Sequence, residues 1–125
     1  MTGAARFIAI IDSDRGVRNA LVRLLRAHGF RPQGYASGET FLARGHADDP
    51  ACLVLDVKLD GMSGIDLLHC LEADGLSSPA VVMTAAEDEA TRRNAIAAGC
   101  VAYLQKPSSV ELLLAAIAQA TRPVG

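Results

Sequence analysis

Four short apolar runs in this chain each lead into a polar residue: Asp12, Asp56, Thr84 and Lys106. Segments of helical period separate the runs, and this alternation is typical of βαβ units with a mostly parallel sheet. The carboxyl ends of parallel strands lie along one edge of an open α/β sheet, where ligands bind. We therefore expect two carboxylates, a hydroxyl and an ammonium group to converge on one pocket.

The same patterns predict five strands and five helices. The strands are expected at 6–11, 31–35, 51–56, 80–84 and 101–105, and the helices at 15–28, 37–42, 64–73, 87–98 and 109–120. Pro32 and Gly34 place the second strand at an edge of the sheet, where a missing backbone donor is tolerated. Ser37 is expected to cap one helix, and Ser63 and Ser108 begin capping-box patterns for two others.

Length and composition indicate one domain, with a core at about 6–120 and a tail or linker at 121–125. No apolar stretch approaches the roughly 20 residues of a membrane span. The N-terminus has no basic segment followed by a long apolar one, so we expect a cytoplasmic protein. A net charge of −2 and the absence of Trp give no basic, aromatic surface for nucleic acid.

The cysteines and histidines do not form a recognisable site. Cys52, Cys70 and Cys100 lack the paired short spacings of a zinc site, so we interpret them as reduced packing residues. The three histidines are scattered and are expected at the surface; they are His28, His46 and His69.

The strand-end residues suit phosphoryl chemistry. Carboxylates of Asp12, Asp14 and Asp56 placed together would repel unless a cation relieves the repulsion. Mg²⁺ prefers oxygen ligands and commonly uses one or two carboxylates with phosphate oxygens. A carboxylate can also attack phosphorus to form an aspartyl phosphate, while Lys106 and the Thr84 hydroxyl can stabilise phosphoryl oxygens. The set predicts a phosphoryl-accepting site.

These residues, in this order and spacing, resemble the receiver domains of two-component response regulators. The motifs are Asp12, Leu55-Asp56 followed by Met62-Ser63-Gly64, Thr84-Ala85, Ala98-Gly99, Tyr103 and Lys106-Pro107. The resemblance implies a doubly wound (βα)5 fold, a flavodoxin-like three-layer sandwich whose parallel five-stranded sheet has the order 2-1-3-4-5. It also implies a phosphorylation-dependent signalling switch that catalyses only its own phosphoryl transfer and autodephosphorylation.

Residue by residue, the resemblance implies that Asp56 accepts the phosphoryl group. Mg²⁺ would be held by Asp12, Asp56 and the backbone carbonyl of Lys58. Thr84 would contact a phosphoryl oxygen, and Lys106 would neutralise its charge.

The resemblance also implies a route for the signal. The Lys106–Pro107 peptide would be cis, and Tyr103 would be an aromatic switch that turns inward as Thr84 moves. The signal would leave through the fourth helix, fifth strand and fifth helix. Lys58 and Ala86 stand where the family tunes dephosphorylation.

The implied partners follow from the same resemblance. They are a histidine kinase or histidine phosphotransfer protein, a downstream output domain or protein, and a second copy of the chain in a phosphorylation-linked homodimer. The donor would dock against the first helix near Ala20 and Leu24. Neither nucleic acid nor a membrane is an implied partner.

Three positions depart from the family pattern. Ser13 replaces the usual second acid, so Mg²⁺ affinity should fall unless Asp14 swings in or a water bridges the gap. Asp60-Gly61 replaces a proline-containing turn and is expected to loosen the loop after Asp56, and Ser108 stands where phenylalanine is frequent, which alters packing at the output face.

Two other functions compete with the switch. One is a degenerate receiver that acts as a phosphate-independent protein-interaction module, with Ser13 as the sign of lost metal chemistry. The other is a flavodoxin-like cofactor binder. The cofactor binder is disfavoured because the acidic segment 12–15 would repel an anion and lacks a glycine- or hydroxyl-rich loop of free amides.

Overall fold

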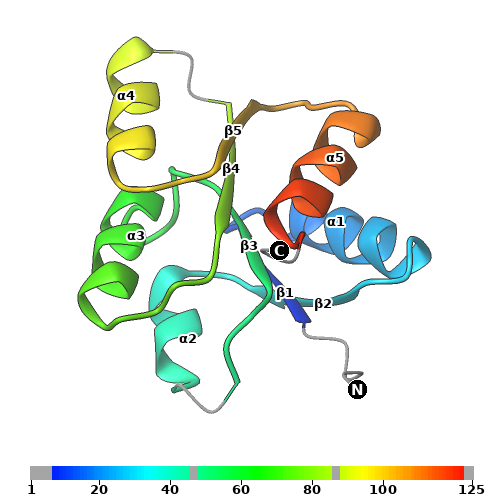
Figure 1. Ribbon diagram of the computed structural model, residues 1–125, viewed down its shortest axis with the longest axis horizontal. Helices are drawn as coiled ribbons and strands as arrows, with labels where there is room; N and C mark the ends of the chain where they lie inside the picture. Colours follow the sequence, from blue (N-terminus) through cyan, green and yellow to red (C-terminus); the bar gives the residue numbers. More distant parts are fainter. Residues whose placement is uncertain (1–6, 46–47, 86–87, 123–125) are drawn as a thin grey trace.

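The computed structural model describes residues 7–45, 48–85 and 88–122, in which strands and helices alternate (Figure 1). The strands are β1 (Phe7–Ile11), β2 (Arg31–Tyr35), β3 (Cys52–Leu55), β4 (Ala80–Thr84) and β5 (Ala102–Gln105). The helices are α1 (Arg15–Ala27), α2 (Gly38–Ala43), α3 (Gly64–Ala73), α4 (Glu89–Ala97) and α5 (Val110–Ala120). Five βα units in sequence confirm the predicted (βα)5 fold.

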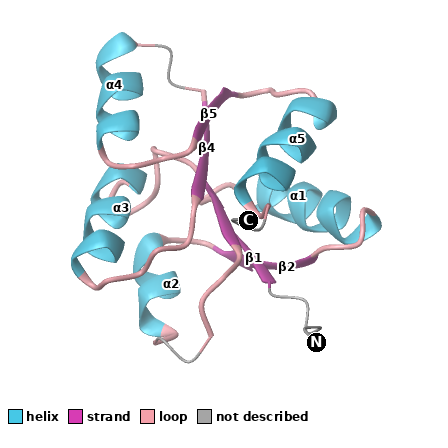
Figure 2. Cartoon of the chain, in the orientation of Figure 1, coloured by secondary structure: helices cyan, strands magenta, loops and turns pink. Residues whose placement is uncertain are grey.

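The strands, coloured magenta in Figure 2, form one parallel sheet in the order β2-β1-β3-β4-β5. All residues of β1, β3 and β4 are buried, as expected for strands covered on both faces. The β2 strand, with Pro32 and Gly34, lies at an edge, which confirms its predicted place. The other edge is β5.

Helices cover both faces of the sheet and enclose two apolar clusters. Successive side chains of a strand point to opposite faces: Phe7, Ala9 and Ile11 join one cluster, and Ile8 and Ile10 join the other. The first cluster packs against α2, α3 and α4, and the second against α1 and α5, which lie on opposite sides of the sheet in Figure 1. This is the three-layer sandwich that the sequence predicts.

Most element boundaries agree with the sequence to within two residues. The capping box expected at Ser108 is wrong: the Ser109 hydroxyl accepts the Leu112 N–H (3.1 Å) and caps α5, so Glu111 falls one position too early for that box. Ser37 and Ser63 cap α2 and α3 as predicted.

Some predicted segments extend beyond the described residues. The starts expected at residues 6 and 87 and the end of the 121–125 tail lie outside them. In the described part, Asp88 caps α4. No helix among residues 7–45, 48–85 and 88–122 combines the length and apolar character of a membrane span.

Candidate functional site

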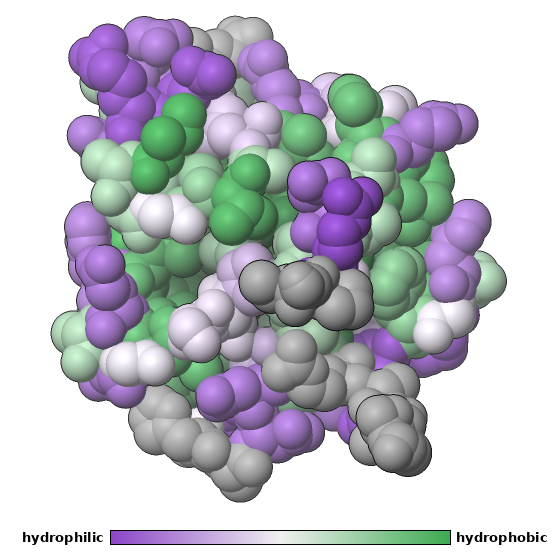
Figure 3. Space-filling view, in the orientation of Figure 1, coloured by the Kyte–Doolittle hydropathy of each residue, from purple (hydrophilic) through white to green (hydrophobic). Residues whose placement is uncertain are grey.

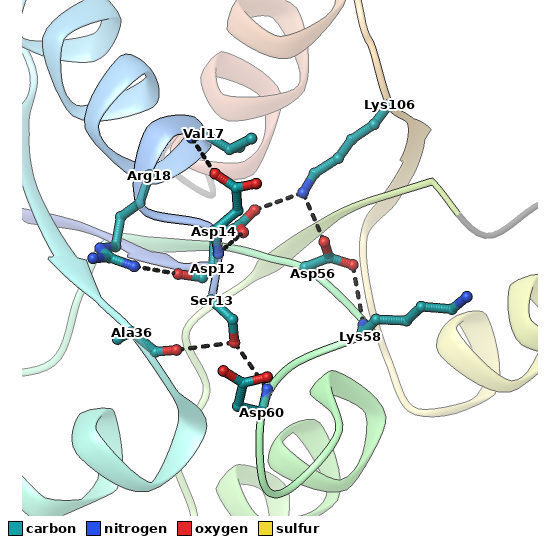
Figure 4. A network of polar contacts seen from close by, with 10 residues as sticks. All are labelled: Asp12, Ser13, Asp14, Val17, Arg18, Ala36, Asp56, Lys58, Asp60 and Lys106. Atoms are coloured by element: carbon teal, nitrogen blue, oxygen red, sulfur yellow. Dashed lines mark hydrogen bonds and ion pairs between the residues drawn. The ribbon is translucent and has the colours of Figure 1, made fainter.

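Three of the strand-end side chains meet at the carboxyl edge of the sheet (Figure 4). Lys106 Nζ lies 2.6 Å from Asp12 Oδ2 and 2.6 Å from Asp56 Oδ2. The side chain of Lys106 is 17% exposed, that of Asp12 5% and that of Asp56 12%. A single ammonium group therefore bridges two mostly buried carboxylates, as the alignment of the strand ends predicted.

The sheet itself positions these three residues. The Asp12 N–H donates to Tyr35 O (3.1 Å), and the Asp56 N–H donates to Ile11 O (3.2 Å). The Arg18 guanidinium adds a hydrogen bond to the Asp12 carbonyl (2.7 Å). The hydrogen bonds between strands thus continue through both carboxylate residues and hold their backbones in register.

Electrostatics keep the bridging lysine charged. Burial alone would lower the pKa of Lys106, but its hydrogen bonds to Asp12 and Asp56 and the charges of both carboxylates outweigh burial and raise it. Removal of one partner from such a cluster would leave uncompensated charge in a poorly solvated site.

The donor set fits a hard divalent cation. Asp12 and Asp56 supply carboxylate oxygens, and the Lys58 backbone carbonyl, expected as a further ligand, belongs to the loop directly after Asp56. Within the part of the chain that is described, no three His, Cys, Asp or Glu side chains cluster as a complete metal site. Two carboxylates with phosphate oxygens are a common ligand set for Mg²⁺, so the residues present suit that ion.

Ser13 and Asp14 make other contacts. The Ser13 hydroxyl donates to Ala36 O (3.1 Å) and accepts the Asp60 N–H (2.8 Å). Asp14 Oδ1 accepts the Val17 N–H (3.0 Å) and so caps α1. Both side chains therefore have structural partners rather than a place between the two clustered carboxylates.

The loop after the phosphoacceptor candidate is tied at several amides. The Lys58 N–H donates to Asp56 Oδ1 (3.0 Å), and the Met62 N–H donates to Glu39 Oε2 (2.9 Å). At its end, a Cβ on Gly64 would overlap the backbone carbonyl oxygen of Asp56, so only glycine fits there. Side chains from two other segments, Ser13 and Glu39, thus hold amides of this loop, and the loosening expected from Asp60-Gly61 stays a prediction.

Thr84 and Tyr103 lie at the carboxyl end of β4 and on β5. Thr84 is fully buried, and its carbonyl accepts the Lys106 N–H (2.9 Å). Tyr103 is half-buried against the cluster beneath α2, α3 and α4. Burial, and then the negative charge of Asp88, raise the pKa of Tyr103. The Lys106–Pro107 peptide is cis.

The remaining candidates are Lys58, Ala86, the cysteines and the histidines. Lys58 is exposed, whereas Ala86 lies outside the described residues. All three cysteines are free, and burial raises the pKa of Cys52 to about 12. His28 and His69 are exposed, as predicted, and His46 lies outside the described residues.

An apolar hollow of about 490 Å³ adjoins the site, between α1 and the segment that follows β5. Ala20 and Leu24, expected to contact the phosphodonor, line it together with Lys106 and Pro107. Sequence reasoning named residues on both walls but did not predict that they share one hollow. By contrast, hydrophilic side chains gather over α4 (Figure 3), and the buried residue of this helix is Ala95.

Comparison with known proteins defines the class. The model of the response regulator receiver domain family matches residues 8–118, so the chain belongs to that family. It is 34% identical over 110 residues to the transcriptional regulatory protein FixJ of Azorhizobium caulinodans, covering 88% of this chain and 52% of that protein. It is 32% identical over 117 residues to the C4-dicarboxylate transport transcriptional regulatory protein DctR of Rhodobacter capsulatus, covering 89% and 59%.

Solved structures agree with these relatives. The crystal structure of FixJ-N matches with a TM-score of 0.89 and 29% identity over 98% of this chain and 99% of that chain. The response regulator StyR matches with a TM-score of 0.88 and 36% identity, covering 95% of this chain and 60% of that one. The chain spans about half the length of the curated relatives it matches.

Membership of the family establishes the general function. The chain is a receiver domain of two-component signalling, a phosphorylation-dependent switch rather than a classical enzyme. Receivers of this family generally bind Mg²⁺ at the phosphorylation site and interact with histidine kinases and output domains.

Proposed function

We propose that Asp56 accepts a phosphoryl group from a histidine kinase or histidine phosphotransfer protein. The observation that carries this proposal is the Lys106 ammonium held 2.6 Å from both Asp12 and Asp56 at the carboxyl edge of the sheet. Asp56 is favoured over Asp12 as the acceptor because its side chain is 12% exposed against 5%, and an incoming phosphoryl group must reach it.

The transfer requires only one bond to form and one to break. A carboxylate oxygen of Asp56 attacks the phosphorus of the donor phosphohistidine, and the electron pair of the broken P–N bond stays on the imidazole nitrogen. Lys106 remains protonated because its pKa is raised, and it neutralises phosphoryl oxygens. In autodephosphorylation, water attacks phosphorus, the P–O bond to Asp56 breaks, and phosphate leaves with the water oxygen.

The Mg²⁺ ligands proposed here are Asp12, Asp56 and the backbone carbonyl of Lys58. When bound, the ion neutralises charge on the phosphoryl oxygens. We leave Ser13 and Asp14 outside this set because Ser13 bridges the Asp60 amide and the Ala36 carbonyl and Asp14 caps α1, whereas Asp12 and Asp56 share the bridging ammonium group of Lys106.

Thr84 and Tyr103 are proposed to pass the phosphorylation state to the surface formed by α4, β5 and α5. Exposed apolar side chains support this surface as the output face: Ile96 is 48% exposed, Val101 56% and Leu112 58%. A downstream output domain or a second copy of the chain would bind there. The phosphodonor would enter beside α1, at the apolar hollow that adjoins Lys106.

The domain boundaries remain a prediction. We infer a single receiver domain over 1–125, with its core at about 6–120 and a tail or linker from 121.

Intact-mass measurement after incubation with acetyl phosphate tests the proposal. We expect one phosphoryl adduct with Mg²⁺, less with chelator, and none for Asp56→Asn. Asp14→Asn is the matched control, because asparagine also caps helices well and should leave the adduct intact. No adduct from acetyl phosphate or from a panel of kinases would instead support the phosphate-independent module.

A further inference from the structure

Ser13 joins three loops at the carboxyl edge of the sheet. It lies between β1 and α1, and its hydroxyl donates to Ala36 O, just before α2, at 3.1 Å. The same oxygen accepts the N–H of Asp60, 47 positions away in the loop after β3, at 2.8 Å. Figure 4 shows the hydroxyl between these two backbone atoms.

The segment that Ser13 holds is the phosphoacceptor loop, residues 57–62. Its first contact with the site is the Lys58 N–H, which donates to Asp56 Oδ1 at 3.0 Å. Asp60 follows two residues later, and Met62 is fixed in turn by Glu39. Ser13 therefore holds the middle of a loop whose beginning contacts the phosphoacceptor carboxylate.

A hydroxyl suits this place in a way that a carboxylate does not. Serine donates one hydrogen bond and accepts others, whereas an ionised aspartate only accepts. An aspartate here could accept the Asp60 N–H but could not donate to the Ala36 carbonyl, and its charge would face that oxygen. The contacts of residue 13 are therefore those of a bridge between loops.

We propose that Ser13 is a positioning residue, which fixes the phosphoacceptor loop and the Lys58 backbone at Asp56 by hydrogen bonds instead of by metal ligation. The consequence for phosphoryl transfer rests on the proposed role of Asp56. The structural consequence does not rest on that role, because it is only that the order of the loop depends on the hydroxyl at position 13.

Amide hydrogen exchange by NMR tests the structural part. Ser13→Ala should raise the exchange rate of the Asp60 amide about fivefold, as expected for loss of one hydrogen bond. Ser13→Thr retains the hydroxyl and should keep the wild-type rate. Ser77→Ala, an exposed serine in the loop before β4, is the matched control and should also leave the rate unchanged. An unchanged Asp60 rate in Ser13→Ala would overturn the proposal.

Mg²⁺ titration and phosphorylation kinetics, read beside the exchange rate of metal-free protein, separate positioning from ligation. In Ser13→Ala we expect the Mg²⁺ dissociation constant to rise about tenfold, because the loop that carries the proposed Lys58 ligand loses its bond to Ser13, and Ser13→Thr should restore it. The maximal rate of phosphorylation by acetyl phosphate should fall at least about fivefold through misplacement of the loop, with the half-saturating concentration unchanged. Ser13→Thr should restore the rate.

The outcomes are distinct. A loss of Mg²⁺ affinity in Ser13→Ala with no change in the Asp60 exchange rate of the metal-free protein would make Ser13 a metal ligand and contradict the proposal. A phosphorylation rate that stays low in Ser13→Thr, although the Asp60 amide of that variant is protected from exchange, would also contradict the proposal. If wild-type protein forms no adduct at all, the proposed function fails, and the exchange rates still decide whether Ser13 positions the loop.

Discussion

Replacement of Lys106 by methionine tests the charge balance of the site. The two carboxylate oxygens each lie 2.6 Å from Nζ, so they are at most about 5 Å apart, where two unit charges repel by about 3 kcal/mol at an effective dielectric constant of about 20. Water that enters in place of the ammonium group reduces this repulsion, and we expect Lys106→Met to lower the free energy of unfolding by about 2 kcal/mol without Mg²⁺.

Urea unfolding followed by circular dichroism measures this change. Lys58→Met is the matched control, since Lys58 is the other lysine of the sequence and its side chain is exposed, so we expect a change below about 0.5 kcal/mol. Adding Asp56→Asn to Lys106→Met removes one of the repelling charges and should recover most of the loss. The reasoning is refuted if Lys106→Met is as stable as the control, or if Asp56→Asn restores nothing.

Three further predictions use other features of the structure. Because the folded-state pKa of Lys106 is raised above 10.5, its contribution to stability is fully present below that pH and is lost as pH rises through the folded-state pKa. The difference in free energy of unfolding between wild type and Lys106→Met should therefore shrink only above pH 10.5. A difference that shrinks between about pH 7 and 9 would contradict this. Gly64→Ala should lower the free energy of unfolding by about 2–3 kcal/mol, because its Cβ would overlap the carbonyl oxygen of Asp56 and lie 2.7 Å from a methyl group of Leu55. Gly75→Ala, at φ +80° with open space around it, should cost only about 1 kcal/mol, and equal losses in the two variants would argue against the overlap. Asp88→Ala removes the cap of α4 and should raise amide exchange at Thr91 about fivefold, whereas an unchanged rate would show that the cap is dispensable.

The sheet and the central charge cluster could be predicted because they follow from local patterns. Apolar runs of strand length alternate with helical segments, and parallel strands align their carboxyl ends. Asp12, Asp56 and Lys106 come directly after three such runs, so their convergence required no knowledge of loop conformation. Pro32 and Gly34 likewise indicated an edge strand through their backbone properties alone.

The loop contacts could not be predicted, because they depend on segments distant in sequence that the fold brings together. No periodicity connects Ser13 with Ala36 and Asp60, and the sequence indicates at position 13 only the absence of the family's usual second acid. Likewise, nothing in the sequence around Asp60-Gly61 indicates that Glu39 of α2 holds the next amide. At α5, two adjacent serines could each serve as the cap, and pattern alone does not fix a helix end to one residue.

The site of phosphorylation is tested most directly by chemical trapping. Protein incubated with acetyl phosphate and Mg²⁺ is treated with borohydride, which reduces an aspartyl phosphate to homoserine and releases phosphate, and the modified residue is then located by peptide mass spectrometry. We predict homoserine at position 56, where the carboxylate is held by Lys106 and the Lys58 amide. Homoserine at position 12, or an unmodified chain after exposure to active phosphodonors, would contradict Asp56 as the phosphoacceptor.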